Sequence, residues 1–153
     1  MRQADAPELE SHTDGILEEH RRLHGYLEEV EAALSATQPK EAVTSSLASA
    51  LGQLGPFVQA HFAREEEERL FDRIQERWPH AAGACERLRG EHRVLLARLE
   101  RLRAEAEAGS IDERALSTLV DGARSLLKDL RRHEALENEL LTASLDDAMA
   151  AQD

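Results

Sequence analysis

Cysteine, aromatic residues and positive charge are all scarce in this sequence, and each shortage excludes a class of protein. The single cysteine, Cys85, can form neither an internal disulfide nor a thiolate zinc site. The 19 lysines and arginines are outnumbered by 31 aspartates and glutamates, and the net charge of −12 repels a phosphate backbone. No apolar run reaches the ~20 residues that span a bilayer, and the N-terminus lacks the apolar core of a signal peptide. We therefore predict a soluble, cytoplasmic protein that binds neither nucleic acid nor a membrane.

Helix-forming residues dominate the composition, and β-branched residues nowhere alternate with polar ones as a strand requires. Apolar residues recur at helical spacing in four stretches, which run from Ile16 to Leu34, Leu47 to Phe71, Leu88 to Leu102 and Ile111 to Leu140. Four helices joined by short loops indicate an all-α, up-down-up-down four-helix bundle. We expect the bundle over residues 12–145, with an N-terminal extension at 1–11 and a C-terminal tail at 146–153.

The breaks between the four stretches carry residues that begin or end helices. Pro39 suits the first turn of the second helix, and Pro79 ends that helix and begins the third. Ser110 with Glu113 forms a capping box for the fourth helix. Pro56 lies inside the second helix, where it either kinks the helix and redirects the segment that follows or is tolerated by the packing.

The seven histidines outnumber the five aromatic residues, and four of the histidines obey an internal repeat. When residues 13–72 are laid over residues 85–144, His20 aligns with His92 and His61 aligns with His133. Each half also has a glutamate four positions after its second histidine, and a Glu-His-Arg sequence around its first. The chain is therefore predicted to consist of two similar helix hairpins that pack about a pseudo-twofold axis.

Residues four apart lie on one face of a helix, so each His-x-x-x-Glu pair continues the apolar stripe that faces the core. Imidazoles and carboxylates in a core are unfavourable unless they are paired or bound to metal. The two hairpins together supply six candidate metal ligands, which are His20, His61, Glu65, His92, His133 and Glu137. Four imidazoles and two carboxylates suit two metal ions bridged by the carboxylates, and they favour iron, manganese or zinc over calcium or magnesium. The alternative is a bundle whose inward histidines and glutamates hydrogen-bond only one another.

This order of one histidine and then His-x-x-x-Glu, repeated in each half, resembles the hemerythrin-like, or HHE cation-binding, family from about residue 12 to about residue 145. The resemblance implies a four-helix bundle that holds two iron ions in an oxo- or hydroxo-bridged centre, with manganese or zinc as alternative metals. By position in the family motif, one iron would take His20 and His61, the other His92 and His133, and the bridges would be Glu65 and Glu137.

Two positions separate the sequence from the oxygen carriers of that family. Oxygen carriers have a His-x-x-x-His pair in the third helix and an aspartate five residues after the last histidine, where this chain has Leu96 and Asn138. The pattern is closer to the iron-sensing and iron-centre-repair members, which argues against simple reversible oxygen carriage. His24, four residues after His20, is a candidate fifth histidine ligand. The alternatives are that it lies outside the ligands and supports them, or that it pairs with Glu28 at the rim of the helix.

The function that this resemblance implies first is the binding, sensing or scavenging of O₂ or a related small ligand such as NO or peroxide. A second interpretation is enzymatic, either catalase-like or peroxidase-like turnover or iron donation for iron–sulfur repair. A third is an iron-buffering or purely structural bundle. A leucine and alanine seam on the fourth helix is compatible with a homodimer, and the sequence identifies no redox partner.

Overall fold

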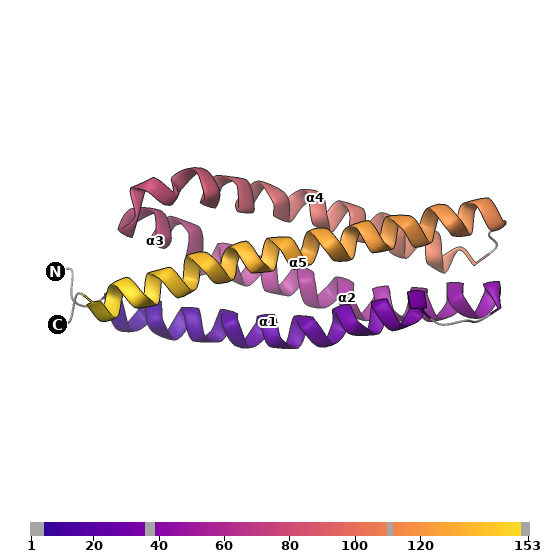
Figure 1. Cartoon of the computed structure of the whole chain (residues 1–153), viewed down its shortest axis with the longest axis horizontal. Coiled ribbons are helices and arrows are strands. Elements are labelled where there is room, and N and C mark those ends of the chain that lie inside the picture. The colour runs from indigo at the N-terminus through magenta and orange to yellow at the C-terminus, as the bar shows by residue number, and fades with distance from the viewer. Residues whose placement is uncertain (1–4, 36–38, 110–111, 151–153) are drawn as a thin grey trace.

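Four long helices make up the computed structural model, which describes residues 5–35, 39–109 and 112–150. The elements are α1 (Asp5–Ser35), α2 (Lys40–Glu67), the short α3 (Leu70–Arg77), the 3₁₀ turn η1 (Pro79–Ala81), α4 (Ala82–Glu107) and α5 (Glu113–Ala150). Successive long helices run in opposite directions, and α1 begins at the end of the bundle where α5 finishes (Figure 1). The predicted all-α, up-down-up-down bundle is therefore confirmed, and no described residue lies in a strand.

The helices extend past the bounds expected for the domain. Part of the expected N-terminal extension belongs to α1, which begins at Asp5, and part of the expected tail belongs to α5, which ends at Ala150. Within the bundle, α2 remains helical through Pro56, whose side chain is exposed. None of the described helices combines the length and the apolar composition that a bilayer crossing requires. The limits of the functional domain at residues 12 and 145 stay a prediction.

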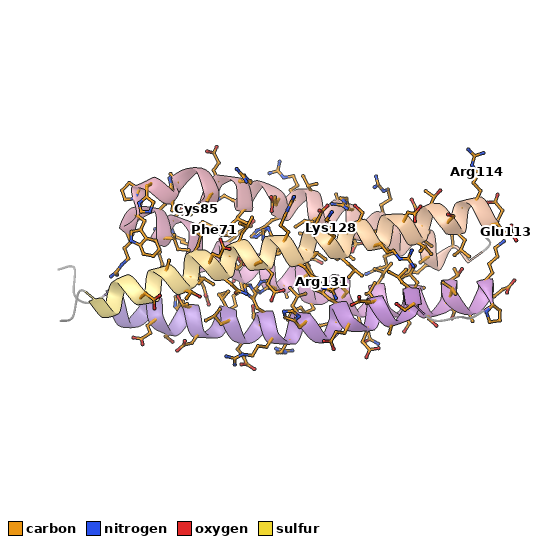
Figure 2. The ribbon with its side chains drawn as sticks, in the orientation of Figure 1. Phe71, Cys85, Glu113, Arg114, Lys128 and Arg131 are labelled. Carbon is orange, nitrogen blue, oxygen red and sulfur yellow. The ribbon has the colours of Figure 1, made fainter. Side chains whose placement is uncertain are left out.

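The second expected helix is interrupted, so the prediction of one continuous helix through residue 71 is wrong. α2 ends before Arg69, which adopts a left-handed conformation with a φ of 54°. This conformation costs a non-glycine residue about 1–3 kcal/mol. The turn brings Phe71 and Ile74 of α3 into one buried cluster with Cys85 of α4, and this burial offsets the strain. Phe71 and Cys85 lie at the end of the bundle where α3 packs (Figure 2).

The starts of two helices differ from the expected ones. Pro39 precedes α2 rather than lying in its first turn, and its carbonyl accepts the N–H of Ala42 at 2.9 Å. Asp112 caps α5, because its Oδ1 accepts the N–H of Ala115 at 2.7 Å. The predicted capping box depends on Ser110, which lies outside the described residues.

A layer of buried polar side chains divides the apolar core into two clusters. Along α1 the chain passes from Ile16 in the smaller cluster, through His20, to Leu23 in the larger cluster. α4 repeats this order at the equivalent positions of the second hairpin, and α2 and α5, which run the other way, meet the larger cluster first. One layer of histidines and glutamates therefore crosses all four long helices, and the apolar clusters on its two sides exclude water from it.

Candidate metal centre

All six residues predicted as ligands meet in the polar layer, and each is at most 3% exposed. Their donor atoms form two groups in which every atom lies within 4.8 Å of the others. The first group contains His20, His61, Glu65 and Glu137. The second group contains His92, His133 and Glu137. Because each of the four long helices contributes to this layer, the site depends on the assembly of the whole bundle.

Both glutamates direct one oxygen toward each histidine pair. The Oε2 atom of Glu137 is 3.0 Å from Nε2 of His20, and its Oε1 atom is 2.5 Å from Nε2 of His133. The Oε1 atom of Glu65 is 2.7 Å from Nε2 of His61, and its Oε2 atom is 3.9 Å from Nε2 of His92. Each carboxylate therefore spans the two pairs, as a carboxylate that bridges two cations must.

Several buried ligand atoms in the layer make no hydrogen bond of good geometry among the described residues. They are both carboxylate oxygens of Glu65, Oε1 of Glu137, and Nε2 of His92 and His133. Three of them lie in histidine–glutamate contacts of 2.5–2.7 Å whose angles do not suit a hydrogen bond. Imidazole nitrogens and carboxylate oxygens that converge in this way in a buried layer are the ligands that transition metals take. The residues present therefore fit a cation-binding centre.

Two further glutamates orient the second histidine of each half. Oε2 of Glu19 lies 2.6 Å from Nδ1 of His61, and Oε2 of Glu91 lies 2.7 Å from Nδ1 of His133. Arg64 donates to the other oxygen of Glu19 at 2.9 Å and holds that carboxylate in place. An Nδ1–H that donates to a carboxylate fixes the ring and leaves Nε2 as the ligand atom.

The other two histidines have outer partners that also follow the repeat. The Nδ1 atom of His20 is 2.7 Å from Oδ1 of Asn138, and the Nδ1 atom of His92 is 3.3 Å from Oε1 of Glu66. Asn138 and Glu66 occupy equivalent positions in the two halves, each directly after a candidate ligand. From the sequence alone, we interpret Asn138 only as a difference from the oxygen carriers. The equivalence of positions 66 and 138 in the repeat could have identified both residues as partners of the histidines.

His24 lies outside both donor groups. Its side chain is 57% exposed, and its Nε2 atom is 3.3 Å from Oε1 of Glu134, a carboxylate that is 5% exposed. Burial raises the pKa of Glu134, and the neighbouring histidines oppose this rise. Glu28, the alternative partner considered from the sequence, forms no ion pair or hydrogen bond with His24 among the described residues. Ligation by His24 stays a prediction, and the buried Glu134 was not anticipated.

Aromatic rings and burial set the electrostatics around the ligands. Phe62 stacks on His92 with ring centroids 4.0 Å apart. Burial lowers the pKa of His61, but Glu65 and Glu19 outweigh it and raise that pKa to about 9. Burial and the charge of Glu137 raise the pKa of Glu65 to about 7. Burial opposes ionisation of Glu137 too, yet three histidines hold its pKa well below the usual value.

These shifts predict how the stability of the metal-free protein depends on pH. His61 has a pKa of about 9 in the folded state against an ordinary value of 6.5, so its stabilising contribution is lost as the pH rises through 9. The raised pKa of Glu65, about 7, acts in the same direction because ionisation of the buried carboxyl disfavours the folded state. We expect the free energy of unfolding to fall by about 2 kcal/mol or more between pH 6 and pH 9. Urea unfolding of chelator-treated protein measures this fall.

The variant Glu65→Gln provides the matched test of that pH dependence. It removes the carboxyl that titrates and the main partner that raises the pKa of His61, so the fall in stability should flatten. A stability that rises from pH 6 to pH 9 in the unsubstituted, metal-free protein would show that these pKa shifts have been assigned in the wrong direction.

The fold and the donor set define a cation-binding helical bundle, and a comparison with protein families gives the same class. The model of the hemerythrin HHE cation-binding domain matches residues 11–145. The chain therefore belongs to the hemerythrin HHE cation-binding domain family. No curated protein and no solved structure matches the chain. The predicted family is confirmed, and its match covers every candidate ligand.

Proposed function

We propose that this chain is a non-haem di-iron protein that binds, senses or scavenges O₂ or a related small ligand such as NO or peroxide. The observation that carries the proposal is the placement of Glu65 and Glu137, because each directs one oxygen to each histidine pair. His20 and His61 would hold one ion, and the other would be held by His92 and His133. Both glutamates would be shared between the ions.

The two sides of the centre are unequal, which supports a role in binding a small ligand. Glu65 lies 2.7 Å from Nε2 of His61 but 3.9 Å from Nε2 of His92. Each ion would take two imidazoles and one oxygen of each shared glutamate, and the longer distance leaves more room for an external ligand on the His92 side. A pair of iron ions supplies the electrons for binding or reducing O₂ or peroxide. The protein holds the imidazoles in place and excludes water from the layer.

The environment of the two histidine pairs adds to this inequality. On the side of His92, Phe62 covers the ring and Leu96 occupies the position equivalent to His24. On the side of His20, the equivalent of Phe62 is the buried carboxylate of Glu134. An apolar wall beside His92 favours a weakly solvated ligand there, whereas Glu134 and His24 make the surroundings of His20 polar.

Metal analysis combined with optical titration tests the proposal. After expression in iron-rich medium, we expect about two iron ions per chain and a near-ultraviolet absorption band that changes reversibly with O₂ or NO. Fewer than about one iron ion per chain after such expression would contradict the di-iron centre. Zinc in place of iron would keep the metal centre but would contradict the proposed redox chemistry, and manganese would contradict the proposed metal.

The same preparations separate the alternative functions. Sustained evolution of O₂ from peroxide would identify a catalase-like enzyme, and transfer of iron to a metal-free iron–sulfur protein would identify an iron donor. An iron-loaded protein whose spectrum responds to none of these ligands would be an iron buffer or a structural bundle.

A further inference from the structure

A pocket of about 550 Å³ extends to the metal centre from one side of the bundle. Its walls come from the end of α2, from α3 and from α4, and they include Glu65 and His92. The pocket therefore reaches the His92 side of the centre, where Glu65 lies 3.9 Å from the histidine. Phe71 and Leu96 contribute apolar surface to the same pocket. This arrangement provides a route toward the position that an external ligand would occupy.

Three arginines line this pocket, although the chain as a whole carries a net charge of −12. Arg89 is 2.7 Å from Asp72, and Arg69 is 3.3 Å from the same aspartate. Arg93, the residue after His92, forms no ion pair or hydrogen bond among the residues that the structure describes. Three carboxylates line the pocket as well: Asp72 pairs with two arginines, Glu66 lies 3.3 Å from His92, and Glu65 is a candidate metal ligand. Arg93 is therefore the lining arginine whose guanidinium is available to a ligand.

The residues that line this pocket have different equivalents in the other hairpin. The residue equivalent to Arg69 is Leu141, which is fully buried in the continuous helix α5. The residue equivalent to Arg89 is Leu17, which packs against the smaller apolar cluster. The left-handed turn at Arg69 follows the end of α2, whereas α5 continues as a helix through the equivalent position.

We propose that this pocket admits a small monovalent anion to the metal pair on the His92 side, and that Arg93 is the residue that selects negative charge. The inference rests on the proposed function, since it needs a metal ion at His92 and His133. An unpaired guanidinium near a partly enclosed path raises the local concentration of anions and their rate of entry. Uncharged ligands such as O₂ and NO gain nothing from it.

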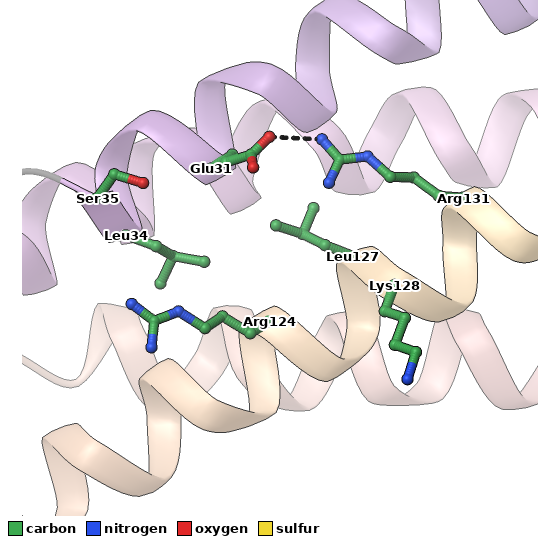
Figure 3. A pocket seen from close by; sticks show the side chains of 7 residues that line it. All are labelled: Glu31, Leu34, Ser35, Arg124, Leu127, Lys128 and Arg131. Atoms are coloured by element: carbon green, nitrogen blue, oxygen red, sulfur yellow. Dashed lines mark hydrogen bonds and ion pairs between the residues drawn. The ribbon is translucent and has the colours of Figure 1, made fainter.

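A second cationic hollow shows what distinguishes this pocket. It has a volume of about 360 Å³ and lies between α1 and α5, where Arg124, Lys128 and Arg131 line it (Figure 3). Its Arg131 is paired with Glu31 at 2.6 Å, and none of the candidate ligands contributes to its walls. A hollow lined by positive charge therefore does not necessarily reach the metal centre, and the pocket beside His92 differs because candidate ligands line it.

The repeat supplies a matched control for the test. Arg21 is the equivalent of Arg93 in the first hairpin, and it is exposed and paired with Glu18 at 2.6 Å. The variants Arg93→Gln and Arg21→Gln lose the same charge from equivalent helix positions. Lys128→Gln removes a charge from the second hollow. All three should retain the iron content of the unsubstituted protein.

The experiment is an azide titration of iron-loaded protein, followed by the azide-to-iron absorption band, together with stopped-flow binding of NO. We expect Arg93→Gln to lower the azide association rate about threefold to tenfold and to weaken its dependence on ionic strength. NO binding to Arg93→Gln, and azide binding to the two control variants, should be unchanged.

Two outcomes would overturn the inference and leave the di-iron proposal standing. One is an iron-loaded protein in which Arg93→Gln and Arg21→Gln bind azide equally fast. The other is an equal loss of azide and NO binding in Arg93→Gln, which would indicate a structural role for Arg93. A chain that holds no iron contradicts the proposed function itself and this inference with it, and metal analysis identifies that case before any titration.

Discussion

Replacing Glu137 by alanine should reduce the iron content from about two ions per chain to below about 0.2. Glu137 is the only residue that belongs to both donor groups among the described residues. Its oxygens lie 3.0 Å from His20 and 2.5 Å from His133. The substitution therefore removes one ligand from each ion at once, and it leaves three buried imidazoles without their carboxylate partner.

The matched control for this variant is Glu139→Ala. Glu139 lies two residues further along the same helix, is exposed, and carries the same formal charge. Metal analysis after gel filtration should show full occupancy in this control. Glu137→Gln keeps the size of the side chain but removes its negative charge, so its iron content should fall as well. Two tightly bound ions in Glu137→Ala would rule out the bridging role.

The ligands could be predicted from the sequence because their signal is local and occurs twice. The four-residue spacing of His61 and Glu65 places both on one helix face whatever the rest of the chain does. The same spacing recurs at His133 and Glu137, the equivalent positions of the second half. Helical periodicity and the repeat were therefore enough to bring the ligands into one layer.

The interruption after α2 could not be predicted in the same way. Residues 65–68 are four glutamates, and neither glycine nor proline marks the turn at Arg69. The left-handed turn is held by tertiary packing, since Phe71 and Ile74 are buried with residues of α4. The pocket that reaches His92 depends on this turn, so its presence also lay beyond the sequence pattern.

The outer partners of the histidines were only partly visible in the sequence. The glutamate before the first histidine of each half belonged to the repeat, but its partner is the histidine 42 residues later. Pairing Glu19 with His61 requires the relative rotation of two neighbouring helices, which periodicity does not specify. The contact of His24 with Glu134 depends on the packing of α1 against α5 in the same way.

Removing the metal should lower the midpoint of thermal unfolding by roughly 15–30 °C. An ion that binds only the folded protein stabilises it by about 4 kcal/mol when its free concentration is a thousand times its dissociation constant. Two such ions contribute about 8 kcal/mol, and 1 kcal/mol shifts the midpoint of a chain of this size by roughly 2–4 °C. Removing both ions should therefore lower the midpoint of thermal unfolding by the roughly 15–30 °C stated above.

Thermal unfolding of chelator-treated and reconstituted protein, followed by circular dichroism at 222 nm, measures this shift. Glu137→Ala is the control variant, because its midpoint should respond little to added iron. Glu139→Ala should respond as the unsubstituted protein does. Equal midpoints with and without metal in the unsubstituted protein would show that the polar layer is satisfied by its own contacts.

The shift of the unfolding midpoint on metal removal should depend on pH, and this dependence distinguishes metal binding at the ligands from a general effect of cations. Protons and metal ions compete for His61 and Glu65, whose pKa values in the metal-free protein are raised to about 9 and about 7. Raising the pH destabilises the metal-free protein and at the same time releases these ligands for the metal. The difference in midpoint should therefore widen between pH 6 and pH 8. A cation that acted through the acidic surface would give a difference in midpoint that falls with ionic strength. That difference would change little between pH 6 and pH 8, because surface carboxylates are already ionised at pH 6.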